Sequence, residues 1–256
     1  MSGPQIHAGP NLAVLVTGGS GASGVAVARA LHKAGHNVFT VGSHRDRIEA
    51  AAQEAGGVAP LTCDLAKFDD VRQLRNDVTA AAGRVDAVIH LVGGWRGANG
   101  IAEQSDEDWD FLHQGAVTTL RNVSRVFFED IAASGHGRFA IVSSTAVEKP
   151  AAGVASYAAA KAAAETWTMA MADGFRKASE ADGGGQAAAV VLVVKALVDD
   201  AMRRSHPERT FPGATDVEEL AAAVVQLFNT PGDELNGTRL RLADQPAQGQ
   251  YLDLEA

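Results

Sequence analysis

A tyrosine and a lysine four residues apart, with a serine upstream of them, are the residues best placed to move a proton. The segment from Tyr157 to Lys161 reads YAAAK, a helix-forming composition, and residues four apart lie on the same helix face. A nearby ammonium stabilises a phenolate, so we expect Lys161 to lower the pKa of Tyr157 from about 10 toward neutral pH. Ser144 ends an apolar run and supplies a hydroxyl that can hold the oxygen of a reacting carbonyl group. Each residue alone fits a structural role, and it is the combination that predicts acid–base catalysis.

A glycine-rich segment near the N-terminus has the spacing of a phosphate-binding turn. The stretch from Thr17 to Gly24 reads TGGSGASG and follows an apolar, strand-like run. Such glycines permit a tight turn and let the backbone approach a pyrophosphate, whose charge is stabilised by the N-terminus of the next helix. A plain tight connection is the alternative interpretation. We predict a dinucleotide site here, formed by Gly18, Ser20, Gly21, Ala22, Ser23 and Gly24, with Gly19, Gly21 and Gly24 in the G-x-G-x-x-G pattern.

The residues after the second predicted strand indicate which nicotinamide cofactor is bound. An NAD site usually has an aspartate or glutamate here for the ribose hydroxyls, whereas this chain has Ser43, His44 and Arg45. The missing acid and the fixed cation favour NADP(H) over NAD(H). An exposed loop with an incidental arginine is the alternative.

Seven apolar runs look like buried strands, and helical periodicity fills the stretches between them. One such stretch is Val25 to Ala34, which ends at Gly35, and Ser105 and Asp216 each precede an acidic first helical turn. This alternation predicts a single domain over residues 12–256, a doubly wound α/β fold of Rossmann type with a mostly parallel seven-stranded sheet and helices on both faces. Residues 1–11 are expected to form a flexible tail and residues 182–185 a surface loop. The predicted strands are Ala13–Thr17, Asn37–Val41, Val58–Thr62, Ala87–Leu91, Phe139–Ser143, Ala188–Val194 and Thr238–Leu242.

Composition excludes several classes of partner. The formal net charge of -9 argues against binding to nucleic acid or to an anionic membrane surface. Residues 1–11 contain no apolar stretch long enough for a signal peptide, and no segment approaches the roughly 20 apolar residues that a membrane span needs. Cys63 is the single cysteine, so no intramolecular disulfide can form, which suits a reducing cytoplasm. No cluster of His, Asp, Glu or Cys has metal-ligand spacing, so no metal site is expected.

In order and spacing, these motifs resemble the short-chain dehydrogenase/reductase family. The resemblance runs from Leu12 to about Leu242 and rests chiefly on the Ser, Tyr and Lys set. It implies hydride transfer between a nicotinamide cofactor and a small carbonyl or alcohol substrate, in a homodimer or homotetramer. It also implies that Asp64 and Leu65 lie by the adenine, that Gly93 and Gly94 lie along the cofactor, and that Lys161 binds the nicotinamide ribose.

Three departures from the family pattern concern the cofactor pocket and the proton relay. His90-Leu91-Val92-Gly93 replaces Asn-Asn-Ala-Gly, Ala116 stands where an asparagine commonly supports the relay, and Lys195-Ala196 replaces Pro-Gly. They motivate a second hypothesis, a dinucleotide-binding regulatory or scaffold protein without activity. A nucleotide-sugar epimerase is a third hypothesis, for which the C-terminal region is short. The segments Gly18 to Gly24 and Gly93 to Trp95 also look like dihydropteridine reductase-type members.

The remaining residues of interest have competing interpretations. His90 is expected to be a hydrogen-bonded core histidine and Cys63 a small buried hydrophobe. Trp95 either lines the substrate pocket or anchors its loop, and Lys195 either contacts cofactor or substrate or turns to solvent. The charged residues Asp199, Asp200, Arg203 and Arg204 either form a metal or phosphate site or, as we expect, a solvated loop and helix start. The segment from Ala201 to Thr215 is expected to cover the site.

Overall fold

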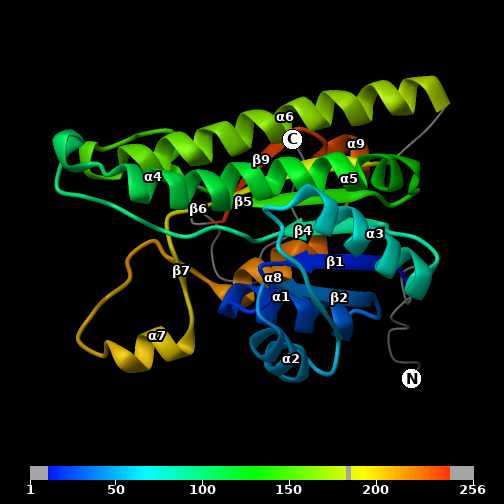
Figure 1. Ribbon diagram of the computed structural model, residues 1–256, viewed down its shortest axis with the longest axis horizontal. Helices are drawn as coiled ribbons and strands as arrows, with labels where there is room; N and C mark the ends of the chain where they lie inside the picture. The colour runs from blue at the N-terminus through cyan, green and yellow to red at the C-terminus, as the bar shows by residue number, and fades with distance from the viewer. Residues whose placement is uncertain (1–10, 183–185, 243–256) are drawn as a thin grey trace, which may run out of the picture.

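Seven parallel strands form the central sheet, in the order β3-β2-β1-β4-β5-β6-β9 (Figure 1). The structure is a computed structural model that describes residues 11–182 and 186–242. The predicted fold class is confirmed, and each predicted strand differs from the observed one by at most one residue at either end. The strands are β1 (Ala13–Thr17), β2 (Asn37–Gly42), β3 (Ala59–Thr62), β4 (Ala87–His90), β5 (Arg138–Ser144), β6 (Ala188–Val194) and β9 (Thr238–Arg241).

Helices cover both faces of the sheet because alternate strand residues are apolar on both sides. In β1, Val14 and Val16 belong to one buried cluster and Leu15 to the other. The first cluster is closed by α1 (Ala22–Lys33), α2 (Arg45–Glu54) and α8 (Val217–Gln226). The second is closed by α3 (Phe68–Ala82), α5 (Thr119–Ala133) and the long α6 (Ala155–Asp182), which lies along the top of Figure 1. The helix expected from Val25 begins three residues earlier, inside the glycine-rich segment.

A small second sheet lies beyond the carboxyl ends of the main strands and was not predicted. Its strands, β7 (Leu197–Val198) and β8 (Thr215–Asp216), are two residues each and pair in parallel on either side of the short helix α7 (Asp200–Ser205). The predicted helix start is confirmed, since the Asp199 side chain accepts a hydrogen bond from the Met202 amide at 2.6 Å. The cap expected at Asp216 is also present, as a capping box with Glu219.

The remaining elements connect β4 to β5 and β5 to α6. The predicted start at Ser105 is confirmed, because its hydroxyl accepts a hydrogen bond from the Asp108 amide. The tail was predicted over residues 1–11, of which the structure describes Asn11. The loop was predicted over residues 182–185, of which the structure describes Asp182, the last residue of α6. The other residues of both segments lie outside the described part of the chain. These connecting elements are η1 (Ile101–Glu103), α4 (Asp106–His113), the π-helical η2 (Gln114–Thr118), η3 (Thr145–Val147) and η4 (Ala152–Val154), while α9 (Gly232–Leu235) precedes β9.

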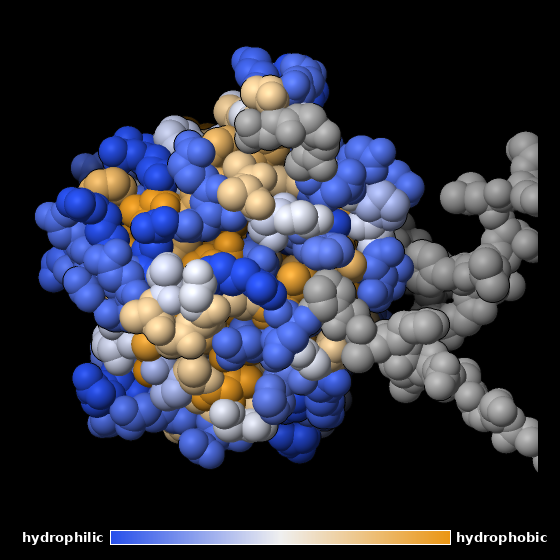
Figure 2. Space-filling model, turned by 90° about the vertical axis from the view of Figure 1, so that its right-hand side faces the viewer, coloured by the Kyte–Doolittle hydropathy of each residue, from blue (hydrophilic) through white to orange (hydrophobic). Residues whose placement is uncertain are grey.

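The exposed large apolar side chains belong to the segments that follow the carboxyl ends of the strands. Among the described residues they are Trp95, Ile101, Trp109, Phe111 and Met202, in the stretch after β4 and in α7. The side of the molecule where the strands begin is mainly hydrophilic, with small apolar patches (Figure 2). Within residues 11–182 and 186–242, no helix has the length and apolar character that crossing a bilayer requires.

Gly18, directly after β1, is required by both conformation and space. Its φ is +74°, and a Cβ there would lie 2.8 Å from the backbone carbonyl of Leu91 after β4. A non-glycine residue would therefore be strained and would also push apart two neighbouring strand ends. Gly35 has φ +91° but has no atom within 4 Å of its Cβ position. A substitution at Gly35 therefore shows the cost of the backbone conformation without the steric contact.

We expect Gly18→Ala to destabilise the protein more than Gly35→Ala. The left-handed conformation costs alanine about 1–2 kcal/mol at either position. The contact with Leu91 adds about 1–3 kcal/mol of overpacking at position 18 alone. Urea denaturation of both variants measures the difference, and equal losses of unfolding free energy would show that the strand ends separate without cost.

Candidate active site

Lys161 lies two turns into α6 with its ammonium buried against β5. Its Nζ donates a hydrogen bond to the Val142 carbonyl at 2.9 Å and lies 6.0 Å from the centre of the Tyr157 ring. Burial lowers the pKa of Lys161 to about 8, and the carboxylate of Glu165, one turn further along α6, opposes that shift. The spacing of YAAAK therefore does place both side chains on the sheet-facing side of one helix.

Tyr157 and Ser144 meet at the end of β5. Both side chains line one cavity, and Ser144 Oγ accepts a hydrogen bond from the Ala146 amide at 3.2 Å. Burial raises the pKa of Tyr157, and the neighbouring Ser144 hydroxyl opposes this rise without reversing it. The prediction of a lowered pKa is therefore wrong for the chain by itself, because loss of hydration outweighs any effect of the Lys161 ammonium. The phenol is protonated at neutral pH.

A buried carboxylate, which the sequence did not predict, lies behind these residues. Glu165 accepts a hydrogen bond from Ser143 Oγ at 2.5 Å and forms an ion pair with Arg239 of β9, whose Nε lies 2.8 Å from Glu165 Oε2. Arg239 also pairs with Glu148 at 2.8 Å, and Glu148 pairs with Arg241. The glutamate four residues after Lys161 was the one available local signal, since Arg239 is 74 residues away from it in the chain.

The glycine-rich turn has the close packing that a dinucleotide site needs. A Cβ on Gly24 would lie 2.5 Å from the Gly18 carbonyl oxygen, and one on Gly19 would lie 1.9 Å from Thr40 Oγ1. Helix α1 begins after Gly21, and no described side chain caps it, so its first amides remain available to an anion. The predicted residues Ser20, Ala22 and Ser23 belong to this same turn and first helical turn.

A cavity of about 480 Å³ connects this turn to the tyrosine and lysine. Ser23 lines one part of it, and Tyr157, Lys161 and Gly93 line another. A Cβ on Gly93 would lie 3.3 Å from Lys161 Nζ, so glycine keeps the ammonium accessible. The arrangement fits an extended dinucleotide, with the glycine-rich turn at one part of the cavity and Lys161 at another. The other lining residues are Leu91, Val92, Gly94, Trp95, Val142, Ser143, Val194, Lys195, Ala196 and Leu197.

The residues after β2 form an exposed cationic group. Ser43 Oγ lies 2.8 Å from His44 Nδ1, and Arg47 hydrogen-bonds the same nitrogen. Arg45 pairs with Glu49 at 3.6 Å, and its side chain is 74% exposed. The sequence predicted Ser43, His44 and Arg45 for this group but not Arg47, which one turn of α2 places beside them.

The predicted adenine residues follow β3 and are held by α5. Asp64 Oδ1 accepts a hydrogen bond from the Ala66 amide at 3.1 Å, and Leu65 is buried. Buried Asn122 of α5 donates to the carbonyls of Leu65 and Ala66 at 3.0 and 2.9 Å. The turn is thus fixed from behind, with one Asp64 oxygen also 3.4 Å from Lys67 Nζ.

His90 and Cys63 are core residues, as expected. His90 Nδ1 lies 2.8 Å from Thr17 Oγ1 and Nε2 lies 3.1 Å from Thr119 Oγ1. Burial lowers the pKa of His90 to about 3, with a smaller contribution from Lys161, so the ring is neutral. Burial also raises the pKa of Cys63 to about 12, which keeps the thiol unreactive. Ala116, at the usual asparagine position, lies within the π-helical η2.

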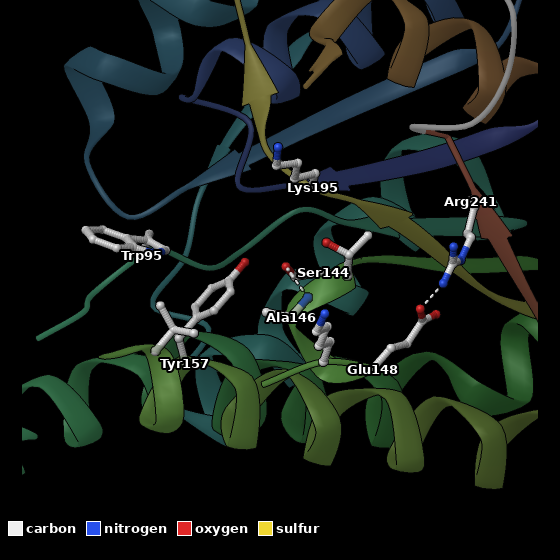
Figure 3. Close-up of a pocket in the computed structure, with 10 residues that line it drawn as sticks. Trp95, Ser144, Ala146, Glu148, Tyr157, Lys195 and Arg241 are labelled. Carbon is white, nitrogen blue, oxygen red and sulfur yellow. Dashed lines mark hydrogen bonds and ion pairs between the residues drawn. The ribbon is translucent and has the colours of Figure 1, made fainter. Parts of the chain in front are cut away.

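A second cavity, of about 470 Å³, opens beside Ser144 and Tyr157 (Figure 3). Trp95 stands at one end, 65% exposed, and Lys195 lies across the cavity from the two hydroxyls. Lys195 is exposed but tethered, because its Nζ donates to the Pro212 carbonyl at 2.8 Å. Both residues predicted for the substrate pocket line this cavity, and their contact with a substrate stays a prediction. In the described ranges, no group of three His, Cys, Asp or Glu side chains could hold a metal ion.

Comparisons with known proteins agree with this fold and motif order. A family model for short chain dehydrogenase matches residues 12–179. The chain is 24% identical over 233 residues to an acetoacetyl-CoA reductase of Allochromatium vinosum, covering 88% of this chain and 94% of the relative. An NADPH-bound short chain oxidoreductase from Pseudomonas aeruginosa with an atypical catalytic center has a TM-score of 0.78 and 19% identity, over 90% of this chain and 94% of that one. An NAD+-bound xylitol dehydrogenase has a TM-score of 0.77 and 18% identity, over 90% of this chain and 97% of that one.

We expect Glu165→Gln to lower the pKa of Lys161 below its value of about 8, because the glutamate opposes the effect of burial. The fraction of Lys161 that is protonated at pH 8 should fall. Titration of lysine Cε resonances by NMR measures this pKa directly. Glu180→Gln is the matched control, since Glu180 lies on the same helix but pairs with Arg176. An unchanged Lys161 titration in Glu165→Gln would contradict the proposed electrostatic coupling.

Proposed function

The chain belongs to the short-chain dehydrogenase family of NAD(P)-dependent oxidoreductases, and on that premise we propose that it reduces a carbonyl group, or oxidises the matching alcohol, through Tyr157, Ser144 and Lys161. The proposal rests on one observation, that a single cavity is lined by residues from both parts of the site. These residues are Ser23 of the glycine-rich turn, Gly93, and Tyr157 and Lys161 of α6. The dihydropteridine reductase-type likeness and the homodimer or homotetramer stay predictions.

In the reductive direction, Tyr157 is the general acid. When bound, the nicotinamide supplies a hydride to the carbonyl carbon. The Tyr157 hydroxyl gives its proton to the carbonyl oxygen, so hydride and proton together convert C=O to CH–OH and leave a phenolate. The Ser144 hydroxyl hydrogen-bonds the same oxygen and stabilises the charge that develops on it. The raised pKa of Tyr157 supports this direction, because the side chain carries its proton at neutral pH.

Lys161 has two functions in this mechanism. Its ammonium is held by the Val142 carbonyl and has N–H groups left for the ribose hydroxyls of the cofactor. The same positive charge stabilises the phenolate that remains after proton transfer. Water then restores the proton to Tyr157. His90 takes no part, because its two ring nitrogens are occupied by Thr17 and Thr119.

Replacing Tyr157 with Phe should abolish turnover and leave cofactor binding nearly intact. Loss of a general acid costs about 100-fold to 10,000-fold in rate, while the phenyl ring still fills the cavity wall. Single-turnover kinetics with NADPH and a panel of carbonyl compounds measure the rate, and fluorescence titration measures the cofactor Kd. Equal losses of both would make Tyr157 a structural residue. Cofactor binding by the unaltered protein without turnover of any compound would instead support the scaffold hypothesis.

We further propose that NADP(H) is preferred over NAD(H). The two cofactors differ in the 2′-phosphate of the adenosine ribose, which would lie at the end of β2. Arg45 and Arg47 supply positive charge there, and Asp46, on the first turn of α2, is the nearest acid in sequence. Ser43 and His44 add hydrogen-bonding groups beside them.

The double variant Arg45→Gln/Arg47→Gln should weaken NADPH binding by at least about tenfold, as expected for lost charged hydrogen bonds. NADH affinity should change little, because NADH lacks the phosphate. Isothermal titration of both cofactors checks this. Arg72→Gln is the control, since Arg72 on α3 is also exposed and paired to an acid, Asp69. Equal weakening of NADPH and NADH would contradict phosphate recognition.

A further inference from the structure

We infer that the substrate is an oxo acid, a carbonyl compound with an anionic group that is recognised by Lys195. This inference rests on the proposed function, since it places the reacting carbonyl group at Tyr157 and Ser144. It starts from the cavity of about 470 Å³ beside those two hydroxyls. Three cationic side chains line that cavity, Lys149, Lys195 and Arg241, against one carboxylate, Glu148.

The carboxylate does not neutralise the two lysines. Glu148 is paired with Arg239 and Arg241, and Arg239 also pairs with Glu165. Those two acids and two arginines balance one another at one end of the cavity, where Figure 3 shows Glu148 and Arg241 facing each other. Among the described residues, no carboxylate lies within ion-pair distance of Lys149 or Lys195. The excess positive charge occurs in a chain with a formal net charge of -9.

Lys195 is held in position to meet a ligand. It follows β6 directly, and its Nζ donates to the carbonyl of Pro212 in the loop that leads into β8. Gly213, with φ +70°, turns that loop around the lysine, and a Cβ there would lie 3.4 Å from Lys195 Cδ. An ammonium has three N–H donors, so two remain for an anion. Because the side chain is tethered, less conformational freedom is lost when a ligand binds.

The placement of Lys195 fits an anion on the same molecule as the carbonyl group. Figure 3 shows the side chain across the cavity from Tyr157 and Ser144, with its nitrogen at the end farther from the two hydroxyls and with Trp95 at one end of the cavity. A substrate lying between these walls would place its carbonyl oxygen at the hydroxyls and its anionic group toward the ammonium. Trp95 and Val154 supply apolar contacts for the carbon chain between the two groups. A carboxylate and a phosphate share this chemistry, and the experiment separates them.

The test compares matched substrates in three proteins: the unaltered chain, Lys195→Met and Lys33→Met. Lys33 ends α1, where the chain turns back toward the start of β2, so this control removes the same charge away from the cavity. Each substrate set contains an oxo carboxylate, the oxoalkyl phosphate of equal length and the uncharged methyl ester. Steady-state kinetics with NADPH give kcat and KM for each compound, and a separate titration gives the NADPH Kd.

We expect the better of the two anionic compounds to exceed the ester at least about tenfold in kcat/KM, mainly through KM. Lys195→Met should remove most of that advantage, whereas Lys33→Met should retain it. Equal kcat/KM for anion and ester, or an advantage that survives in Lys195→Met, would overturn the inference. A large loss of NADPH affinity in Lys195→Met with the advantage retained would also overturn it, by assigning the lysine to the cofactor.

A binding experiment keeps the inference distinct from the proposed function. Glutarate, a dicarboxylate that cannot be reduced, is titrated into each protein in the presence of NADP+ at low and high salt. Binding that is weakened at least about tenfold by Lys195→Met and by salt, but not by Lys33→Met, supports the anion site even if no carbonyl compound is turned over. Turnover of the ester alone, with no glutarate binding, would support the oxidoreductase and refute the anion site.

Discussion

The hydrogen bond from Lys161 to the Val142 carbonyl is the contact on which the site depends. It holds the start of α6 against the end of β5, and this brings Tyr157 and Ser144 to the same cavity. Burial lowers the pKa of this ammonium to about 8, and no ion pair within the described residues engages it, so its charge is available to a ligand. Glu165 fixes the same helix from behind through Ser143 and Arg239, and limits the fall in pKa. Catalytic geometry and electrostatics thus come from one helix–strand contact.

The cofactor part of the site depends on a different constraint, the absence of side chains. Gly18 and Gly24 let the ends of β1 and β4 and the start of α1 approach more closely than any Cβ would allow. Gly93 then keeps the path to Lys161 open. Because the strands are parallel, their carboxyl ends converge at one edge, and residues that follow β1 and β4 line one continuous region there with residues of β5 and β6.

The sequence predicted those features that local patterns encode. Apolar runs located the seven strands to within one residue, and the spacing of Tyr157 and Lys161 placed them on one helix face. The pairing of Glu165 with Arg239 joins residues 74 apart, which no local period indicates. The two-residue strands β7 and β8 are too short to leave a pattern. The pKa of Tyr157 was predicted in the wrong direction because burial, which depends on the assembled cavity, outweighs a charge that spacing alone suggests. Arg47 was missed because it joins His44 only through the first turn of α2.

A crystal structure with NADPH bound tests the central claim most directly. The account predicts pyrophosphate oxygens at the start of α1, ribose hydroxyls hydrogen-bonded to Lys161 Nζ, and the nicotinamide ring against Gly93 and Val194. The hydride-bearing carbon should face the space beside the Tyr157 hydroxyl, leaving room for a carbonyl carbon at about 3–3.5 Å. A cofactor bound elsewhere, or a nicotinamide ring that faces away from Tyr157, would contradict the account.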